Sequence, residues 1–288
     1  MENLITVNEA LDRILARFNQ KESETIPINE GLNQILAENV FACVDLPPFN
    51  NSSMDGFAVQ ANDLQNVSKT SPATLEIVED IPAGYFPQKE IHPGQASRIM
   101  TGAPLPQGAD TVVPVEFTNF SDRYAQQQLM ENIVVYKSVK NGDYVRPKGQ
   151  DIKKGQKIFY KGHRIRPQDL GFLAAQGINK LPVMRKPVIA LLSSGDELVQ
   201  PGEELNPGKI YDSNTITIKS LLSSFGAKIQ DLGLAKDIFE DIKTKLDSIN
   251  QQEVDLIIST AGVSVGVYDF IRDVILEDGN LNFWKVNI

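Results

Sequence analysis

The chain has 288 residues and a formal net charge of −9. This balance repels nucleic acid and anionic lipid, so we expect neither as a partner. An apolar share of 41% with 23% charged residues is typical of a globular protein and argues against disorder. The single cysteine, Cys43, excludes an intrachain disulfide and a cysteine-based zinc site, and two histidines disfavour a His-rich one.

The two ends of the chain lead to separate expectations. The amino terminus lacks the basic start and apolar core of a secretory signal, and no apolar run approaches the ~20 residues of a spanning helix. We therefore expect a cytoplasmic protein. Residues 282–288 are typical of a strand that no polar tail or helix cap follows, so we expect a fragment or a truncated product.

The amino-terminal part alternates short elements with loops. Apolar residues at helical spacing predict a helix over Val7–Phe18, capped by Thr6 with Glu9 at its third position. A short helix is expected over Leu32–Ala37. The segment 45–59 contains two prolines and an Asp-Gly pair, which indicates a functional loop rather than a linker.

Residues 57 to about 140 have an all-β pattern, in which β-rich runs are separated by Pro and Gly turns. The runs are Thr74–Val78, Thr111–Val115 and Ile133–Tyr136. Residues 118–130 are polar and predict a surface hairpin. The segment 141–168 predicts Gly- and Lys-rich loops with one strand, and a helix over Asp169–Gln176 ends at Gly177. A strand around 181–183 follows.

From Pro187 onward, strands and helices alternate, which predicts a parallel, doubly wound sheet. The expected strands are 188–192, 228–232 and 255–259, and the expected helices are 213–225, 238–249 and 269–277. A domain boundary is placed at about Lys186.

Two strand ends in this region carry residues suited to binding a small ligand. The strand 255–259 leads into a loop in which Gly262, Ser264 and Gly266 allow close approach of backbone N–H groups and hydroxyls. Ser194 and Gly195 follow the strand 188–192 in the same way. Because the carboxyl ends of neighbouring parallel strands form one crevice, we expect a small-molecule or nucleotide-like ligand there.

Five motifs occur in one order along the chain. They are Ser53-Met-Asp-Gly-Phe-Ala-Val59, the segment 98–113, Gly149-Gln-Asp-Ile152, Ser194-Gly-Asp-Glu-Leu198 and Ala261-Gly-Val-Ser-Val-Gly266. Together they resemble the molybdopterin molybdenumtransferase family, which includes the E domain of gephyrin, over essentially the whole chain. The resemblance implies an enzyme that inserts molybdenum from molybdate into adenylylated molybdopterin and releases AMP with the help of Mg²⁺.

The resemblance also implies an architecture of α/β plus all-β class. An elongated N-terminal linker domain would comprise residues 1–48 and 141–186, an inserted β domain residues 49–140, and a doubly wound, molybdopterin-binding α/β domain residues 187–288. An elongated homodimer is implied, with each site between the α/β domain of one subunit and the Ser-Met-Asp-Gly domain of the other. Molybdopterin adenylyltransferase would be the pathway partner.

The motif residues outside the α/β domain each have a physical interpretation. Asp55 is assigned a catalytic or metal-linked role, since Gly56 can take a positive φ and expose the carboxylate; an Asx turn is the alternative. Thr101 can offer a hydroxyl and a backbone N–H to an oxyanion, or form a plain turn. Arg146 suits molybdate or phosphate because its planar fork donates twice, although a surface ion pair with Asp151 is possible.

The acidic residues of the α/β domain complete the predicted site. Glu197 is preferred over Asp196 for the magnesium-linked role, Asp212 or Ser213 is expected to cap a helix, and Asp237 and Asp269 can act in the site or as caps. Because like charges repel, the carboxylates make sense only around a hard cation. The predicted catalytic residues are Asp55, Asp151, Glu197, Asp237 and Asp269, of which all but Asp151 are predicted metal ligands. The predicted substrate-binding residues are Thr101, Arg146, Ser194, Gly195, Gly262, Ser264 and Gly266.

The chain departs from the family pattern at three places. Gln150 stands where the family usually has Glu, and Ala261 where it favours a first Gly. Relatives continue beyond the position of Ile288 with a Pro-Gly-Lys-Pro segment and a small β domain. The alternatives are therefore a molybdopterin adenylyltransferase, a non-catalytic dimeric scaffold that binds a peptide, and an inactive truncated homologue.

Overall fold

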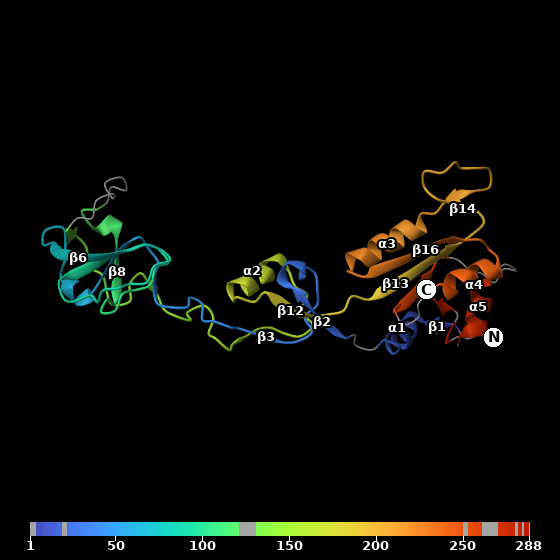
Figure 1. Cartoon of the computed structure of the whole chain (residues 1–288), viewed down its shortest axis with the longest axis horizontal. Coiled ribbons are helices and arrows are strands. Elements are labelled where there is room, and N and C mark those ends of the chain that lie inside the picture. The colour runs from blue at the N-terminus through green and yellow to red at the C-terminus, as the bar shows by residue number, and fades with distance from the viewer. Residues whose placement is uncertain are drawn as a thin grey trace. The chain divides into compact units, whose positions relative to one another are not determined.

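A computed structural model describes residues 4–18, 22–120, 131–249, 253–260, 270–279, 282–283 and 285–287 (Figure 1). The chain divides into two compact units. Unit 1 comprises residues 1–38, 161–171 and 179–288, and unit 2 comprises residues 39–160 and 172–178. None of the helices in the described part of the chain is long and apolar enough to cross a membrane.

Unit 2 contains a five-stranded sheet with the strand order β8-β5-β7-β6-β9. Its pairs are antiparallel, except that β6 and β7 run parallel. Side chains of the interior strand β5 alternate between two buried clusters, with Phe57 and Val59 in one and Ala58 in the other, so both faces of the sheet are covered. The strands are β5 Gly56–Val59, β6 Ala73–Ile81, β7 Gln95–Ile99, β8 Thr111–Pro114 and β9 Asn132–Val135.

The sheet confirms the three β-rich runs predicted in this region as β6, β8 and β9, with ends shifted by a few residues. The run predicted to end at Val115 stops at Pro114, because Val115–Phe117 forms a 3-10 helix (η3). A second 3-10 helix, η2, covers Ala61–Leu64. Most of the predicted hairpin 118–130 lies outside the described residues.

Two short strand pairs complete unit 2. β4 (Asn51–Ser52) pairs antiparallel with β10 (Val145–Arg146), and β3 (Val40–Phe41) pairs antiparallel with β11 (Lys157–Phe159). The prediction of one strand within 141–168 is therefore wrong. Both strands are too short to show a period, and each exists because of a partner far away in the sequence.

Unit 1 contains a parallel sheet with the strand order β16-β13-β17. Helices α4 and α5 pack on each other and against this sheet through a buried apolar cluster that includes Leu192, Ala235 and Ile271. The alternation of strands and helices predicted from Pro187 onward is confirmed. The elements are β13 Val188–Ser194, α3 Asn214–Ser224, β16 Lys228–Ala235, α4 Phe239–Asp247, β17 Leu256–Ser259 and α5 Phe270–Asp278.

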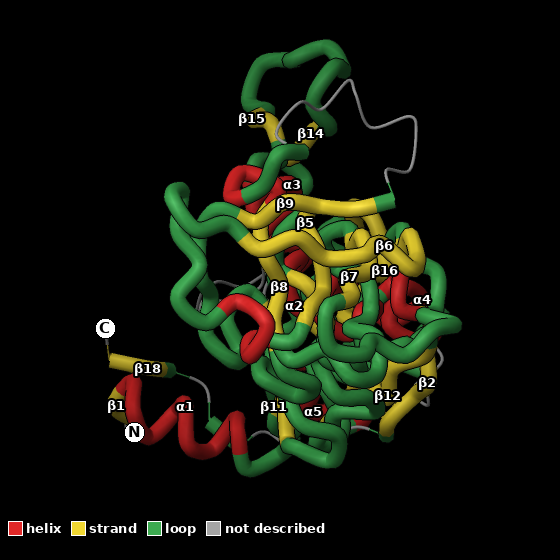
Figure 2. The backbone as a smooth tube through the Cα atoms, turned by 90° about the vertical axis from the view of Figure 1, so that its left-hand side faces the viewer, coloured by secondary structure: helices red, strands yellow, loops and turns green. Residues whose placement is uncertain are grey.

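The remaining elements of unit 1 are short. Figure 2 shows β18 beside β1 and α1, and β1 and β18 pair parallel. β12 pairs antiparallel with β2, and β14 pairs parallel with β15. The elements are β1 Ile5–Thr6, α1 Val7–Leu15, β2 Ser23–Pro27, η1 Ile28–Glu30, α2 Pro167–Ala175 (shared with unit 2), β12 Lys180–Met184, β14 Leu198–Val199, β15 Ile210–Tyr211 and β18 Val286–Asn287.

The predicted first helix is confirmed, although α1 ends at Leu15 rather than Phe18. The Thr6 hydroxyl accepts a hydrogen bond from the Glu9 N–H at 3.2 Å, as the capping prediction requires. The predicted helix Leu32–Ala37 is wrong. Its backbone N–H groups bond to distant segments instead, Leu36 to the carbonyl of residue 163 and Ala37 to that of residue 182.

Helix α2 confirms the helix predicted before Gly177 and begins two residues earlier than expected. The buried Asp169 carboxylate accepts the backbone N–H of Arg166 at 2.9 Å and its guanidinium at 3.0 Å, and lies 2.7 Å from Nε2 of His163. The bonds from the Arg166 side chain hold the pKa of Asp169 well below its usual range, and the His163 ring and the Arg166 N–H add to this effect against the opposing cost of burial.

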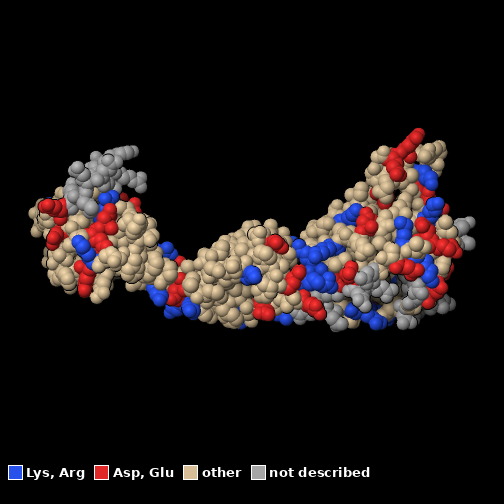
Figure 3. All heavy atoms as spheres, viewed as in Figure 1, with Lys and Arg blue, Asp and Glu red and all other residues tan. Residues whose placement is uncertain are grey.

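Acidic and basic side chains are interspersed on the face of each unit that Figure 3 shows. Ion pairs account for part of this pattern, among them Lys148 with Asp45 at 3.4 Å and Lys219 with Asp231 at 2.7 Å. The bond from Lys219 is also the main reason why the pKa of Asp231 is lowered. Such partly exposed pairs contribute little to stability.

Candidate active site

Asp55 lies in unit 2, half-buried, immediately before β5. Its Oδ1 accepts two hydrogen bonds from Thr101, one from the backbone N–H at 2.8 Å and one from the hydroxyl at 2.8 Å. The carboxylate is therefore held in one orientation. Both Thr101 donors are used by Asp55. The predicted role of Thr101 as an anion ligand therefore stays a prediction.

Gly56 was expected to be glycine because of a positive φ, but the structure gives a different reason. It is not among the glycines with positive φ in the described chain. A Cβ at this position would lie 2.1 Å from the carbonyl oxygen of Val113, which belongs to the neighbouring strand β8. The close approach of two backbones therefore requires glycine here, and the expected positive φ is wrong.

Backbone hydrogen bonds from three other segments hold the loop around Asp55. The Val115 N–H donates to the Asp55 carbonyl at 3.1 Å, and the Gly102 N–H donates to the Ser52 carbonyl at 2.8 Å. The Ser53 N–H donates to the Tyr144 carbonyl at 2.9 Å. Because these partners lie far apart in the sequence, the position of Asp55 depends on the folding of the whole of unit 2.

Arg146 and Asp151 form the ion pair that the sequence allowed as an alternative to anion binding. Nη2 of Arg146 lies 2.6 Å from Oδ2 of Asp151, and the side chains are 46% and 53% exposed. β10 pairs Arg146 with Asn51 and Val145 with Ser52, so Arg146 lies on a strand that adjoins the Asp55 loop. Since the guanidinium carries five donors, the pair leaves it able to bind an anionic ligand as well.

Ser194 is the last residue of β13 in unit 1 and Gly195 follows it, and both are buried. Gly195 has φ of 152°, and a Cβ there would lie 2.9 Å from a carboxylate oxygen of Glu197. Glycine thus lets the Glu197 carboxylate fold back over this turn. Glu197 itself is exposed.

Asp196 and Asp237 form two reciprocal hydrogen bonds between the carboxyl ends of β13 and β16. The Asp196 N–H donates to Oδ2 of Asp237 at 3.4 Å, and the Asp237 N–H donates to Oδ1 of Asp196 at 3.4 Å. The alternative that Asp237 caps the next helix is wrong, because Ile238 is the N-cap of α4 and no side chain bonds there. Four further predicted residues, Gly262, Ser264, Gly266 and Asp269, lie outside the described residues.

A set of hydrogen-bonded hydroxyls at this edge of the sheet was missed by sequence reasoning. Ser213 is the N-cap of α3 but its side chain makes no capping bond; the Thr215 N–H donates instead to Oδ1 of Asp212, one residue earlier, at 3.0 Å. The Thr215 hydroxyl also donates to Asp212 at 2.5 Å, and the Thr260 hydroxyl donates to Ser193 at 2.7 Å. The available signal was a hydroxyl residue at the carboxyl end of each of two neighbouring parallel strands.

The described residues contain no group of three or more His, Cys, Asp or Glu that could hold a metal ion by itself. The predicted magnesium ligands come from both units and include Asp269, so their assembly stays a prediction. The donor chemistry fits Mg²⁺, since this cation takes one or two carboxylates and completes its shell with water and substrate phosphates.

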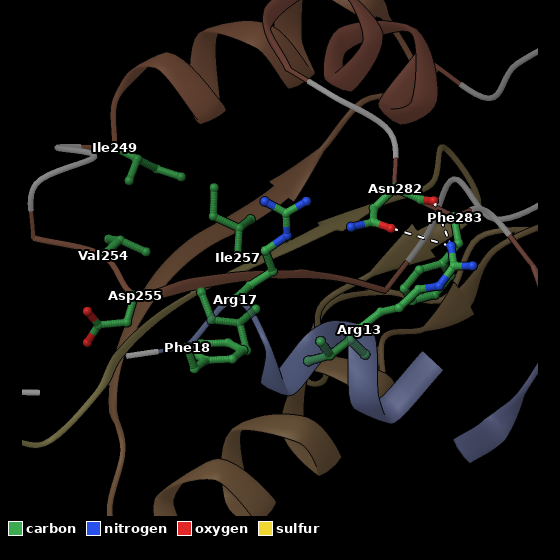
Figure 4. A pocket seen from close by; sticks show the side chains of 11 residues that line it. Arg13, Arg17, Phe18, Ile249, Val254, Asp255, Ile257, Asn282 and Phe283 are labelled. Atoms are coloured by element: carbon green, nitrogen blue, oxygen red, sulfur yellow. Dashed lines mark hydrogen bonds between the residues drawn. The ribbon is translucent and has the colours of Figure 1, made fainter. Parts of the chain in front are cut away.

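Unit 1 also has a cavity of about 610 Å³ that contains none of the predicted site residues. Figure 4 shows Arg13, Arg17 and Phe18 on one side and Ile257 of β17 on another. The Arg13 guanidinium donates to the backbone carbonyl of Asn282 at 3.3 Å. The cavity lies beside the start of β17, whereas Ser194, Gly195 and Asp237 lie at the carboxyl ends of β13 and β16.

Two family models match the chain in series. Residues 5–177 match the MoeA N-terminal region (domain I and II), and residues 190–287 match a probable molybdopterin binding domain. The chain belongs to the MoeA family. The resemblance inferred from the five motifs is thereby confirmed.

MoeA-family proteins from several organisms resemble this chain over most of its length. A molybdopterin molybdenumtransferase from Staphylococcus epidermidis is 36% identical over 272 residues, covering 94% of this chain and 62% of that protein. One from Bacillus subtilis is 36% identical over 273 residues, covering 93% and 61%. The crystal structure of a molybdopterin biosynthesis MoeA protein from Pyrococcus horikoshii superposes with a TM-score of 0.77 at 33% identity, covering 96% and 67%. The chain thus spans about three fifths of the length of these two curated MoeA relatives.

Proposed function

We propose that this chain inserts molybdenum into adenylylated molybdopterin and releases AMP, forming molybdenum cofactor. The observation that carries the proposal is the alignment of 93–94% of the chain with curated molybdopterin molybdenumtransferases at 36% identity. Molybdate and adenylylated molybdopterin are then the substrates. The retained acidic residues of both units argue against a purely structural role.

In unit 2, Asp55 and Arg146 are the groups that we assign to the reaction. Thr101 fixes the orientation of the Asp55 carboxylate through two hydrogen bonds. The carboxylate therefore does not have to reorient when the substrate binds. Arg146 binds molybdate or a phosphate, and Asp151 aligns the guanidinium for that contact.

In unit 1, Glu197 and Asp237 are proposed to hold Mg²⁺ together with Asp55 and Asp269. The cation would neutralise charge on the phosphoanhydride as it breaks. Ser194 and Gly195 would contact the substrate at the carboxyl end of β13, and Gly262, Ser264 and Gly266 would bind its phosphate. We also propose a doubly wound α/β domain, an inserted β domain and a cytoplasmic location.

The proposed assembly is a homodimer that completes each site with unit 1 of one copy and unit 2 of the other. The arrangement predicts complementation between two inactive variants, Asp55→Ala and Glu197→Ala, mixed after reversible dissociation. In a mixed dimer both changes fall in one site and the other site is intact, so about a quarter of wild-type activity should return. No recovery in mixtures shown to contain mixed dimers would place each site within one chain.

The activity itself is tested with adenylylated molybdopterin, molybdate and Mg²⁺, by measuring AMP release and activation of an apo-molybdoenzyme. Asp55→Ala and Glu197→Ala should abolish AMP release with unchanged circular dichroism. Asp63→Ala is a matched control on unit 2, because Asp63 caps a turn by accepting the Gly94 N–H. Consumption of ATP with free molybdopterin would instead identify the adenylylating activity, and normal turnover by either variant would reject the role of that residue.

A further inference from the structure

Four side chains at the carboxyl edge of the unit 1 sheet form one continuous chain of hydrogen bonds. The Thr260 hydroxyl donates to Oγ of Ser193 at 2.7 Å, the Ser193 and Thr215 hydroxyls bond to each other, and the Thr215 hydroxyl donates to Oδ2 of Asp212 at 2.5 Å. Asp212 and Ser193 are each 2% exposed and Thr215 is 9% exposed. Only Thr260, at the other end, is half-buried.

The carboxylate determines the direction of every bond in this chain. A carboxylate only accepts, and a hydroxyl has a single proton to donate. Because the Thr215 proton points to Asp212, the bond between Thr215 and Ser193 must use the Ser193 proton. The Ser193 oxygen in turn accepts the Thr260 proton, so all three protons point toward Asp212.

The consequence falls on Thr260, which follows β17 directly. Its only hydroxyl proton points inward, so its oxygen can offer lone pairs but no proton to a ligand. Phosphate and molybdate oxygens are acceptors too, so this oxygen disfavours them. It suits an N–H or O–H group, at the sheet edge where α/β folds bind their ligands.

We propose that Asp212 is a positioning residue that acts through Thr215 and Ser193 to present Thr260 as an acceptor for an N–H or O–H group of the substrate. The inference rests on the proposed function, which supplies substrates rich in such groups, on both the pterin and the nucleotide. Other groups then bind the phosphates, and Thr260 distinguishes the donor-bearing part of the substrate from its anionic part.

Asp212→Asn tests the direction of the chain with little change of shape. The Asn carbonyl accepts the Thr215 N–H while its amide group donates to the Thr215 hydroxyl, which reverses all three hydroxyls and turns the Thr260 proton outward. Affinity for the substrate group should fall about tenfold, the scale of one unmade hydrogen bond. Thr260→Val should lower the affinity by a similar factor, and Thr260→Ser should keep the wild-type affinity. The double variant Asp212→Asn/Thr260→Val should bind no more weakly than Thr260→Val alone.

Calorimetry with AMP and with molybdopterin identifies the part of the substrate involved, since only the ligand that donates to Thr260 should lose affinity. If Asp212→Asn does not fold, Ser193→Ala breaks the chain without altering the buried carboxylate and should weaken binding about threefold. Wild-type affinity in a folded Asp212→Asn or Ser193→Ala variant, beside a loss in Thr260→Val, would overturn the inference.

Neutron diffraction from deuterium-exchanged crystals tests the inference independently of turnover. The Thr260 deuterium should point to Ser193 in the wild-type protein and away from it in Asp212→Asn. An outward deuterium in the wild-type protein would refute the inference even if the enzyme is active. A wild-type protein that binds neither ligand would instead reject the proposed function and the ligand role of Thr260 together, while leaving the observed direction intact.

Discussion

Gly56→Ala should destabilise unit 2 and displace Asp55 together. The new Cβ would lie 2.1 Å from the Val113 carbonyl oxygen, whereas ordinary contact begins at 3.4 Å, so the two backbones must separate by about 1.3 Å. The Val115 N–H to Asp55 carbonyl bond, now 3.1 Å, cannot survive that separation. One or two lost backbone bonds at about 1 kcal/mol each, with about 1–3 kcal/mol for overpacking, give a loss of about 2–5 kcal/mol.

Gly102→Ala provides a matched control in the same site. Gly102 has a φ of 84°, and a Cβ there would meet nothing within 4 Å, so only the backbone conformation opposes alanine, at about 1–2 kcal/mol. Urea unfolding followed by tyrosine fluorescence measures both changes, and AMP release measures the displacement of Asp55. A Gly56→Ala protein as stable as Gly102→Ala would refute the argument that backbone contact requires this glycine.

Three further substitutions test other contacts. Asp169→Asn should cost about 2 kcal/mol at pH 7 by weakening the bonds with Arg166. Because the folded pKa of Asp169 is lowered, its contribution to stability is present above the unfolded pKa of about 3.9 and is lost as the pH falls through the folded value. Urea unfolding should therefore show the difference in unfolding free energy between the wild-type and Asp169→Asn proteins shrinking in acid. An unchanged difference at pH 3 and below would contradict the assignment. Thr101→Val should lower kcat for AMP release about tenfold at an unchanged melting temperature while Thr101→Ser retains activity, and a full rate in the valine variant would show that Asp55 needs no such support. Gln176→Leu removes the acceptor of two loop N–H groups, at 2.9 and 3.1 Å, and should cost about 1–3 kcal/mol in thermal or urea unfolding; a neutral effect would mean that water replaces the amide.

The α/β half of the fold was predictable because its signals are local. The strands β13 and β17 are short apolar runs, and the stop signal after α3 holds, because Gly226 has a φ of 85°. The helix expected at Leu32–Ala37 failed for the opposite reason. Its composition allows a helix, but its backbone N–H groups find partners in residues 163 and 182, which no local pattern reveals. The predicted domain boundaries stay predictions.

The sequence motifs identified residues of the candidate site, but they did not predict most of the contacts between those residues. Asp55 and Thr101 were each selected on separate motifs, yet nothing in the sequence indicated that Thr101 donates twice to Asp55. The ion pair of Arg146 with Asp151 was foreseen as an alternative because the two residues are close in sequence. The hydroxyl chain that ends at Asp212 joins three segments, so only the folded structure shows it.

The two glycines beside the predicted acids differ in what they make room for. At Gly56 the neighbour is the backbone of β8, which pairs with β5 over all four residues, so a side chain there must disturb the sheet. At Gly195 the neighbour is the end of the flexible Glu197 side chain, which can move aside, but the φ of 152° is one that residues with a side chain rarely adopt. Glycine is therefore required at Gly56 by a neighbouring backbone and at Gly195 by its own backbone conformation. It follows that Gly56→Ala should lose stability and activity together, because the displaced backbone carries Asp55, whereas truncating a side chain at the site, as in Thr101→Val, should lower activity alone.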